Sequence, residues 1–148
     1  MSDTVEAVAV PRVKRIEHSA GALKLEDPIV IVGGKEMQTG IDRLVELLDR
    51  AVGVEIQHVD DAVDADVTVE QTDRLPDCGE SNEAYALEVD ENGIAIAAET
   101  SAGIHHGAVT LIGFVVERGD SWEVPACEIR DWPDFEWRGF MADPARGY

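Results

Sequence analysis

The stretch YALEVDENGIAIAA, residues 85–98, predicts a β-hairpin from which the rest of the fold can be worked out. Every second residue of each arm is apolar, which is the spacing that puts side chains on one face of a strand. Between the arms, Asn92-Gly93 is typical of a tight turn whose residues adopt positive φ angles. The side chains predicted to face inward are those of Tyr85, Leu87, Val89, Ile94, Ile96 and Ala98.

The residues before the hairpin predict one helix and several strands. A helix is expected where apolar residues recur at helical spacing from Ile41 to Val52, with Gly53 as its end. The stretches that predict strands are residues 8–11, 21–25, 28–32, 54–59 and 66–70. The first two are typical of edge strands, and an acidic loop joins the last two.

After the hairpin, Ser101 is expected to cap a second helix over residues 102–118, which Gly119 ends. This helix is apolar around most of its circumference, so more than one of its sides has to be covered. A last strand over residues 122–129, broken by Pro125, follows it.

The order of these elements predicts a single α+β domain over residues 8–130, preceded by a polar tail, residues 1–7. Its expected architecture is a mainly antiparallel β-sheet with two helices on one face. A chain of 148 residues with 45% hydrophobic content is sufficient for one core of this kind.

The charge of the chain is strongly unbalanced. Asp and Glu number 31 against 12 Lys and Arg, which gives a net charge of −19. Because salt must screen such self-repulsion, the composition resembles that of a haloarchaeal protein; an acidic mesophilic protein is the alternative. The sequence has no cluster of Lys and Arg, so neither nucleic acid nor an anionic membrane is expected as a partner.

The N-terminus has no basic region followed by an apolar run, and no run of about 18 apolar residues occurs in the sequence. We therefore expect a location in a salt-rich cytoplasm. Cys78 and Cys127 lack the CxxC spacing and are expected to be free thiols.

The sequence indicates neither a metal site nor a cofactor. His105 and His106 are adjacent on a predicted helix, where they point about 100° apart and cannot ligate one metal together. Gly33-Gly34-Lys35 lacks the spacing of a phosphate-binding loop and is expected to be a turn. Pairs such as Asp60-Asp61 and Asp90-Glu91 fall in polar loops and fit a solvated surface.

The C-terminal residues 137–143 have a short apolar core that could be a buried parallel strand. In barrels, functional residues gather where such strands end, which draws attention to Asp143 and Arg146. The alternative is that Arg138 and Arg146 only balance acidic residues.

Residues 131–146, DWPDFEWRGFMADPAR, resemble the D-x-P-x-F-x-W-R-G-x-M-x-D-x-S/A-R signature of family 20 glycoside hydrolases, the β-N-acetylhexosaminidases. Other stretches are similar to the family in the same order. Residues 10–13 are similar to its opening strand, residues 83–87 to its E-A-Y-x-L strand, and residues 101–111 to its helix pattern S/P-A-G-x-x-x-G-x-x-T-L.

The resemblance implies that residues 131–148 are a linker and the first strand of a catalytic (β/α)8 barrel, and that this barrel rests against the small domain and covers its second helix. It also implies that Arg146 hydrogen-bonds hydroxyls of the terminal sugar, as a planar fork of donors can, with Asp143 in a supporting role. Gly147 departs from the family, in which histidine often follows that arginine.

The activity implied is hydrolysis of terminal N-acetylhexosamine by a substrate-assisted retaining mechanism, in which the 2-acetamido oxygen attacks the anomeric carbon. The Asp-Glu pair that serves this step belongs to a later barrel strand, so the 148 residues alone are expected to be inactive, with no catalytic residue of their own. Two alternatives remain: an accessory domain of another glycosidase family, the O-GlcNAcases or α-glucuronidases, or a free-standing module that binds carbohydrate or protein.

Overall fold

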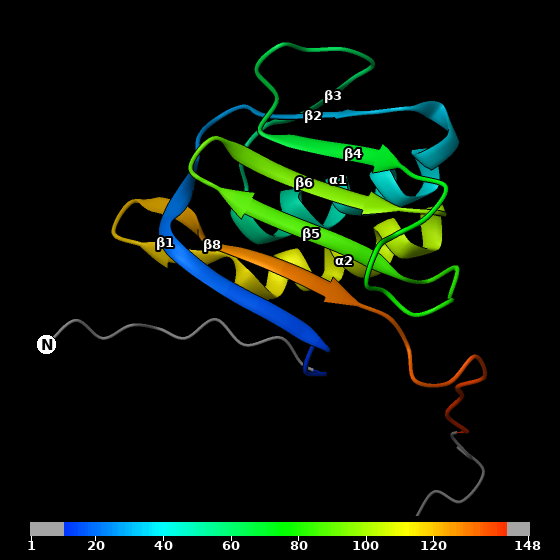
Figure 1. The fold of residues 1–148 in the computed structure, drawn as a ribbon. Coiled ribbons are helices and arrows are strands. Elements are labelled where there is room, and N and C mark those ends of the chain that lie inside the picture. The colour runs from blue at the N-terminus through cyan, green and yellow to red at the C-terminus, as the bar shows by residue number, and fades with distance from the viewer. Residues whose placement is uncertain (1–10, 142–148) are drawn as a thin grey trace, which may run out of the picture.

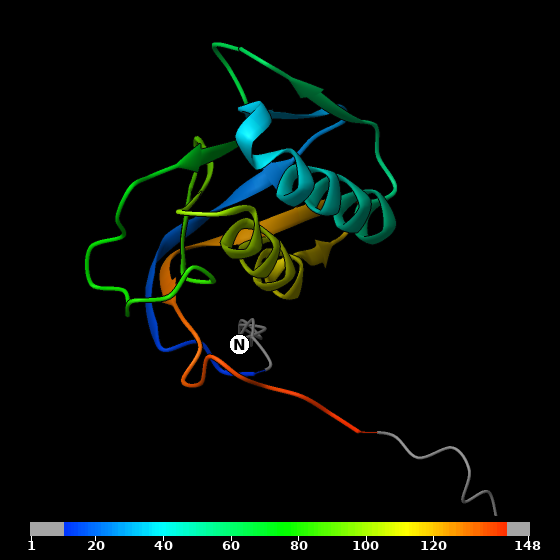
Figure 2. The same ribbon diagram turned by 90° about the vertical axis from the view of Figure 1, so that its right-hand side faces the viewer.

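The computed structural model of the chain describes residues 11–141, in which one β-sheet carries two helices on one face (Figures 1 and 2). The helices are α1 (Gln38–Val52), which follows a 3-10 turn at Lys35–Met37, and α2 (Ser101–Phe114). The strands are β1 (Arg15–Leu25), β2 (Ile29–Gly33), β3 (Ile56–Val59), β4 (Val67–Gln71), β5 (Tyr85–Asp90), β6 (Gly93–Ala98), β7 (Val116–Arg118) and β8 (Ser121–Asp131). The strand predicted over residues 8–11 lies outside the described residues except for its last position.

The sheet is mixed, so the prediction of a mainly antiparallel sheet is wrong for one half of it. Its strand order is β1-β8-β5-β6-β4-β2-β3, with β7 paired to β8. The strands β1, β8, β5, β6 and β7 pair antiparallel, whereas β2, β3, β4 and β6 pair parallel.

The parallel half follows from two connections. Helix α1 crosses over between β2 and β3 and returns the chain in the same direction, as parallel neighbours require. The acidic loop, residues 60–66, then carries the chain past β2, so that β4 pairs with the other edge of β2. Strands β3 and β4 are therefore separated by β2.

The hairpin of residues 85–98 is confirmed in position, and the side chains predicted to face inward are buried. Leu87 lies opposite Ile96, and both are fully buried. The predicted positive φ angles of Asn92-Gly93 are wrong: neither residue has one. The side chain of Asp90 accepts hydrogen bonds from the backbone N–H groups of Asn92 and Gly93, at 2.7 and 3.1 Å, and stabilises the turn without left-handed residues.

Helix α2 differs from the prediction at both ends. Its cap is Thr100, whose Oγ1 accepts hydrogen bonds from the amides of Ala102 and Gly103. The helix ends at Phe114, and residues 116–118 pair with β8 as strand β7, because the sheet offers them hydrogen-bond partners. Gly119, with φ +61°, lies in the turn between these strands rather than at a helix end.

Strand β8 continues through Pro125, which was expected to break it. Pro125 lies opposite Ala22, directly after the register shift that separates His18 from Ala22 in β1. Proline has no N–H group to donate to a ladder, and such irregularities are where strands tolerate it.

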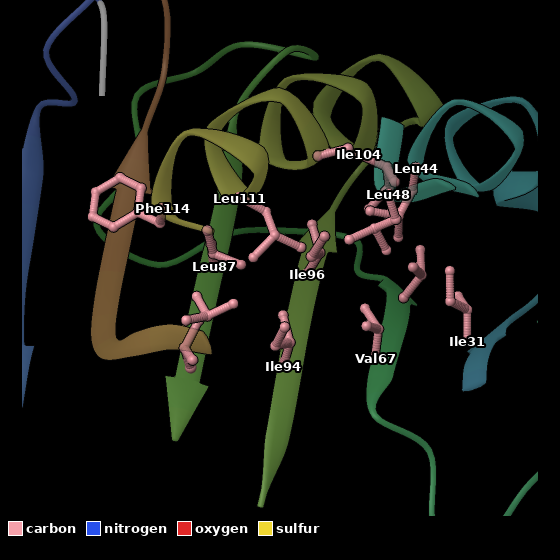
Figure 3. Packing of buried hydrophobic residues seen from close by; sticks show 14 of the residues in the cluster. Ile31, Leu44, Leu48, Val67, Leu87, Ile94, Ile96, Ile104, Leu111 and Phe114 are labelled. Atoms are coloured by element: carbon pink, nitrogen blue, oxygen red, sulfur yellow. The ribbon is translucent and has the colours of Figure 1, made fainter. Parts of the chain in front are cut away.

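The core lies between the sheet and the two helices (Figure 3). Ile96 of β6, Leu111 of α2 and Leu48 of α1 meet there and are fully buried. The helices also cover each other: a Cβ added at Gly40 of α1 would lie 2.7 Å from Ile104 Cβ of α2. The strongly apolar α2 is thus covered on two sides, by the sheet and by α1.

Both cysteines are free, as predicted. Burial raises the pKa of Cys127 to about 11 and raises that of Cys78, so neither thiol is activated as a nucleophile at neutral pH. Neither helix of residues 11–141 has the length and apolar character that crossing a membrane requires.

The surface charge leads to a first prediction. Within residues 11–141 no charged side chain is buried, so the repulsion that goes with the net charge of −19 acts at the surface, where salt screens it. The Debye length falls from about 30 Å at 0.01 M to about 3 Å at 1 M salt. We expect the thermal midpoint to rise between dilute buffer and molar KCl; equal midpoints would contradict a salt-adapted fold.

Candidate functional site

Asp143 and Arg146, the two residues predicted to bind substrate, lie outside the described residues. The segment that leads to them is described as far as Met141. It leaves the sheet where β8 ends, and residues 132–141 form no strand, so the predicted first barrel strand is not confirmed (Figure 2).

The beginning of this segment is packed onto the domain. The Trp132 ring packs against a small cluster of Leu75, Ala84 and Ala86. It lies so close to Gly79 that a Cβ there would be 2.5 Å from Trp132 Cδ1. The Nζ atom of Lys14 lies 5.5 Å from the Trp132 ring centroid. Trp132 is therefore a fixed point between the sheet and the residues that follow.

Beyond Trp132 the apolar side chains are exposed. Phe135 is 71% exposed, and Trp137, Phe140 and Met141 are more than nine-tenths exposed. Burial of these apolar side chains under another surface would lower the free energy of the protein.

Tyr85 of β5 connects this strand to helix α2 and to the end of β8. Its hydroxyl hydrogen-bonds to Thr110 of α2 and donates to Asp131 Oδ2 of β8 at 3.3 Å. The backbone N–H of Lys14 donates to the other oxygen of Asp131 at 3.1 Å. Burial raises the pKa of Tyr85 far above its ordinary value, so the hydroxyl remains a donor at neutral pH.

Glu83, two residues before the start of β5, contacts the side chains of Arg138 and His106. Its Oε1 accepts from Arg138 Nη2 at 2.9 Å and lies 3.0 Å from His106 Nε2 of α2. The opposite nitrogen of the guanidinium, Nη1, donates to the carbonyl oxygen of Phe135 at 2.6 Å. The hydrogen bonds from Arg138 and then from His106 lower the pKa of Glu83.

These residues surround a hollow of about 470 Å³ between α2, the chain before β1 and the segment after β8. Its lining mixes apolar surface with charge: Pro11, Val109, Trp132 and Phe135 contribute the former, and Arg12, Glu83, Asp131, Asp134 and Arg138 the latter. A general acid for glycoside hydrolysis needs a raised pKa, so Glu83, whose pKa is lowered, is unsuited to that role.

Within residues 11–141, neither His105 nor His106 lies in a cluster of side chains that could hold a metal ion. The rings of His105 and His106 meet edge to face, with centroids 5.3 Å apart. Burial is the main cause that lowers the pKa of His105.

Sequence reasoning missed that Glu83, His106 and Arg138 meet. A signal was available for two of them, since Glu83 and Arg138 are fixed positions of the patterns that residues 83–87 and 131–146 resemble, whereas His106 falls on a variable position of the pattern over residues 101–111. Residues that recur in separate family motifs and carry opposite charges are candidates for contact in the fold.

Comparison with known proteins agrees with the fold and with the resemblance. A β-N-acetylhexosaminidase from Cellulomonas fimi is 34% identical over 106 residues, covering 70% of this chain and 21% of the relative. An N,N'-diacetylchitobiase from Vibrio harveyi is 26% identical over 146 residues, covering 97% of this chain and 16% of the relative. The chain thus spans about a fifth or less of the length of these relatives.

The fold is shared with solved structures. The chitobiase of Flavobacterium johnsoniae superimposes with a TM-score of 0.74 at 24% identity, over 93% of this chain and 22% of that one. The family model described as "Glycosyl hydrolase family 20, domain 2" matches residues 8–132, which include every strand and both helices of the sheet domain. A match over this much of the sequence, with the same fold, makes the chain a member of glycosyl hydrolase family 20 that carries the family's domain 2.

Proposed function

We propose that this chain is the accessory domain of a β-N-acetylhexosaminidase and that residues 131–148 lead into the first strand of its (β/α)8 catalytic barrel. The observation that carries the proposal is the exposure of Trp137, Phe140 and Met141, directly after the end of the domain 2 match at residue 132. As a barrel strand, this segment would be paired on both edges and its apolar side chains would be covered.

The same barrel would rest on the helix side of the small domain. Val109 of α2 is 46% exposed beside the hollow that the C-terminal segment borders, so part of this apolar helix faces outward there. Burial of that face by the barrel would cover α2 on a third side, in addition to the sheet and α1.

The proposed substrate is a glycan with a terminal N-acetylhexosamine, in keeping with the names of the relatives, a β-N-acetylhexosaminidase and a diacetylchitobiase. Arg146 would donate hydrogen bonds to hydroxyls of that sugar, with Asp143 beside it. The acetamido oxygen of the substrate would act as the nucleophile, served by an Asp-Glu pair of the barrel.

An assay with a nitrophenyl N-acetylglucosaminide in molar KCl tests this proposal. The 148-residue chain is expected to release no nitrophenol, because the Asp-Glu pair of the proposed mechanism would belong to a later strand of the barrel. A protein in which this chain continues into a barrel is expected to release it. Release by the 148-residue chain itself would contradict the proposal.

In the barrel-containing protein, Arg146→Ala is expected to lower kcat/KM about ten- to a hundredfold, since a hydrogen bond to a charged group contributes about 1.5–3 kcal/mol. Arg118→Ala is the control, because Arg118 pairs with Glu123 at 3.4 Å in the β7–β8 hairpin. Equal kcat/KM values for the two variants would show that Arg146 does not bind the sugar.

A further inference from the structure

We propose that Glu83 is a positioning residue that tethers the C-terminal segment to the domain and sets the direction in which it leaves the sheet. One oxygen of its carboxylate holds both Arg138 of the segment and His106 of α2. Three parts of the chain, the loop that leads into β5, the middle of α2 and the segment after β8, are thereby joined at one atom.

The geometry makes Arg138 a bridge rather than a simple surface ion pair. One terminal guanidinium nitrogen bonds Glu83, while the other bonds the backbone oxygen of Phe135, three residues earlier in the segment. A planar fork of donors can make both bonds at once, which a lysine ammonium cannot do in a fixed geometry. The side chains of Glu83 and Arg138 are 25% and 44% exposed, against 57% and 21% for Glu88 and Arg130, so the two ion pairs are similarly accessible to solvent.

The segment is consequently held at two points. Trp132 is packed over Gly79, and Arg138 is bound to Glu83. An ion pair between Lys14 and Asp134 lies between these points. Residues 132–138 therefore follow a defined path, and whatever follows Arg138 starts from a defined place and direction.

The tether itself does not depend on the proposed function, although its consequence does. If residues 139–148 enter a barrel, Glu83 positions the strand that carries Arg146 relative to the small domain. Protease cleavage after Arg138 measures the tether without any glycosidase activity. Failure of one proposal therefore leaves the other intact.

Trypsin cleavage at the Arg138–Gly139 bond measures the tether, because Arg138 must leave Glu83 to enter the protease. In the 148-residue chain, Glu83→Gln is expected to speed this cleavage about three- to fivefold, the ratio that corresponds to loss of an ion pair worth about 1 kcal/mol. Cleavage tracks the population of the released form when opening is fast. The rate is followed by mass spectrometry at the lowest KCl concentration that keeps parent and variant folded.

Glu88→Gln is the matched control. It removes the same charge from a carboxylate that also binds an arginine, Arg130, at 3.3 Å, but on the body of the sheet. Its cleavage at Arg138 is expected to equal that of the parent. Equal rates for the parent and Glu83→Gln would overturn the proposal, as would equal acceleration by both substitutions.

Arg138→Lys provides a second route in case Glu83→Gln does not fold under the assay conditions. Trypsin also cleaves after lysine, and the charge is retained, yet the two bonds to Glu83 and Phe135 are no longer made together. Faster cleavage of the same bond supports the tether. Because trypsin prefers arginine to lysine, each rate is first divided by the rate at the same bond in a short unstructured peptide, and equal normalised rates contradict the tether.

Discussion

Phe114→Ala is expected to lower the free energy of unfolding by about 3–5 kcal/mol, the usual cost of truncating a buried phenylalanine. Phe114 is the last residue of α2 and is 1% exposed, packed in the core between the helices and the sheet (Figure 3). The substitution removes the buried ring and leaves a cavity in its place. Because the sheet holds the end of α2, the surrounding residues can close this cavity only in part. Because domains are stable by about 5–15 kcal/mol in total, the variant should be close to unfolding.

Urea denaturation in molar KCl, followed by circular dichroism, measures this loss as a lower midpoint at unchanged slope. Phe135→Ala is the matched control, since the same substitution falls on a side chain that is 71% exposed. Its free energy of unfolding is expected to stay within about 0.5 kcal/mol of the parent value. Equal losses for the two variants would contradict the packing of the α2 end described above.

Gly103→Val is expected to lower the free energy of unfolding by about 3 kcal/mol, at the upper end of the usual cost of overpacking. A Cβ at position 103 would lie 2.4 Å from the carbonyl oxygen of Ala84 and 2.6 Å from Ala98 Cβ. Both atoms belong to the sheet region, so the helix would have to move away from β5 and β6. Gly107 makes a similar approach, 2.7 Å from Ile96 Cγ2.

The control for Gly103→Val is Gly113→Val in the same helix, where the glycine is exposed. Valine has a somewhat better helix propensity than glycine, so this substitution should change the free energy of unfolding by less than about 0.5 kcal/mol. The free energies of unfolding of the two variants are compared by their urea midpoints in molar KCl. A Gly103→Val midpoint within error of the Gly113→Val midpoint would show that α2 does not lie so close to the sheet.

The hairpin and α1 were predictable because their signals are local. Alternating apolar residues place Leu87 and Ile96 on one face of neighbouring strands. Gly53, with φ +64°, ends α1 as predicted, because glycine adopts this backbone conformation without steric cost. Two glycines of α2, Gly103 and Gly107, are also part of the sequence pattern that resembles the family. Only the structure explains them, as points where the helix lies close to the sheet.

Other features depend on partners that are distant in the sequence. Val115 and Val116 continue the apolar pattern of α2, yet residues 116–118 pair with β8. The contacts of Glu83 join residues 23 and 55 positions away, which no local pattern reports. Asp143 and Arg146 remain predictions of the resemblance alone.

The amino-acid sequence by itself determined the family, the order of most elements and the buried face of the hairpin strands β5 and β6, because periodicity and motifs are properties of neighbouring residues. The tertiary structure decided the directions of β2, β3 and β4, the end of α2 and the meeting of Glu83, His106 and Arg138. Each of these depends on which segments lie side by side in space, since a strand pairs with the edge it is offered and a charge binds the partner that the fold brings to it.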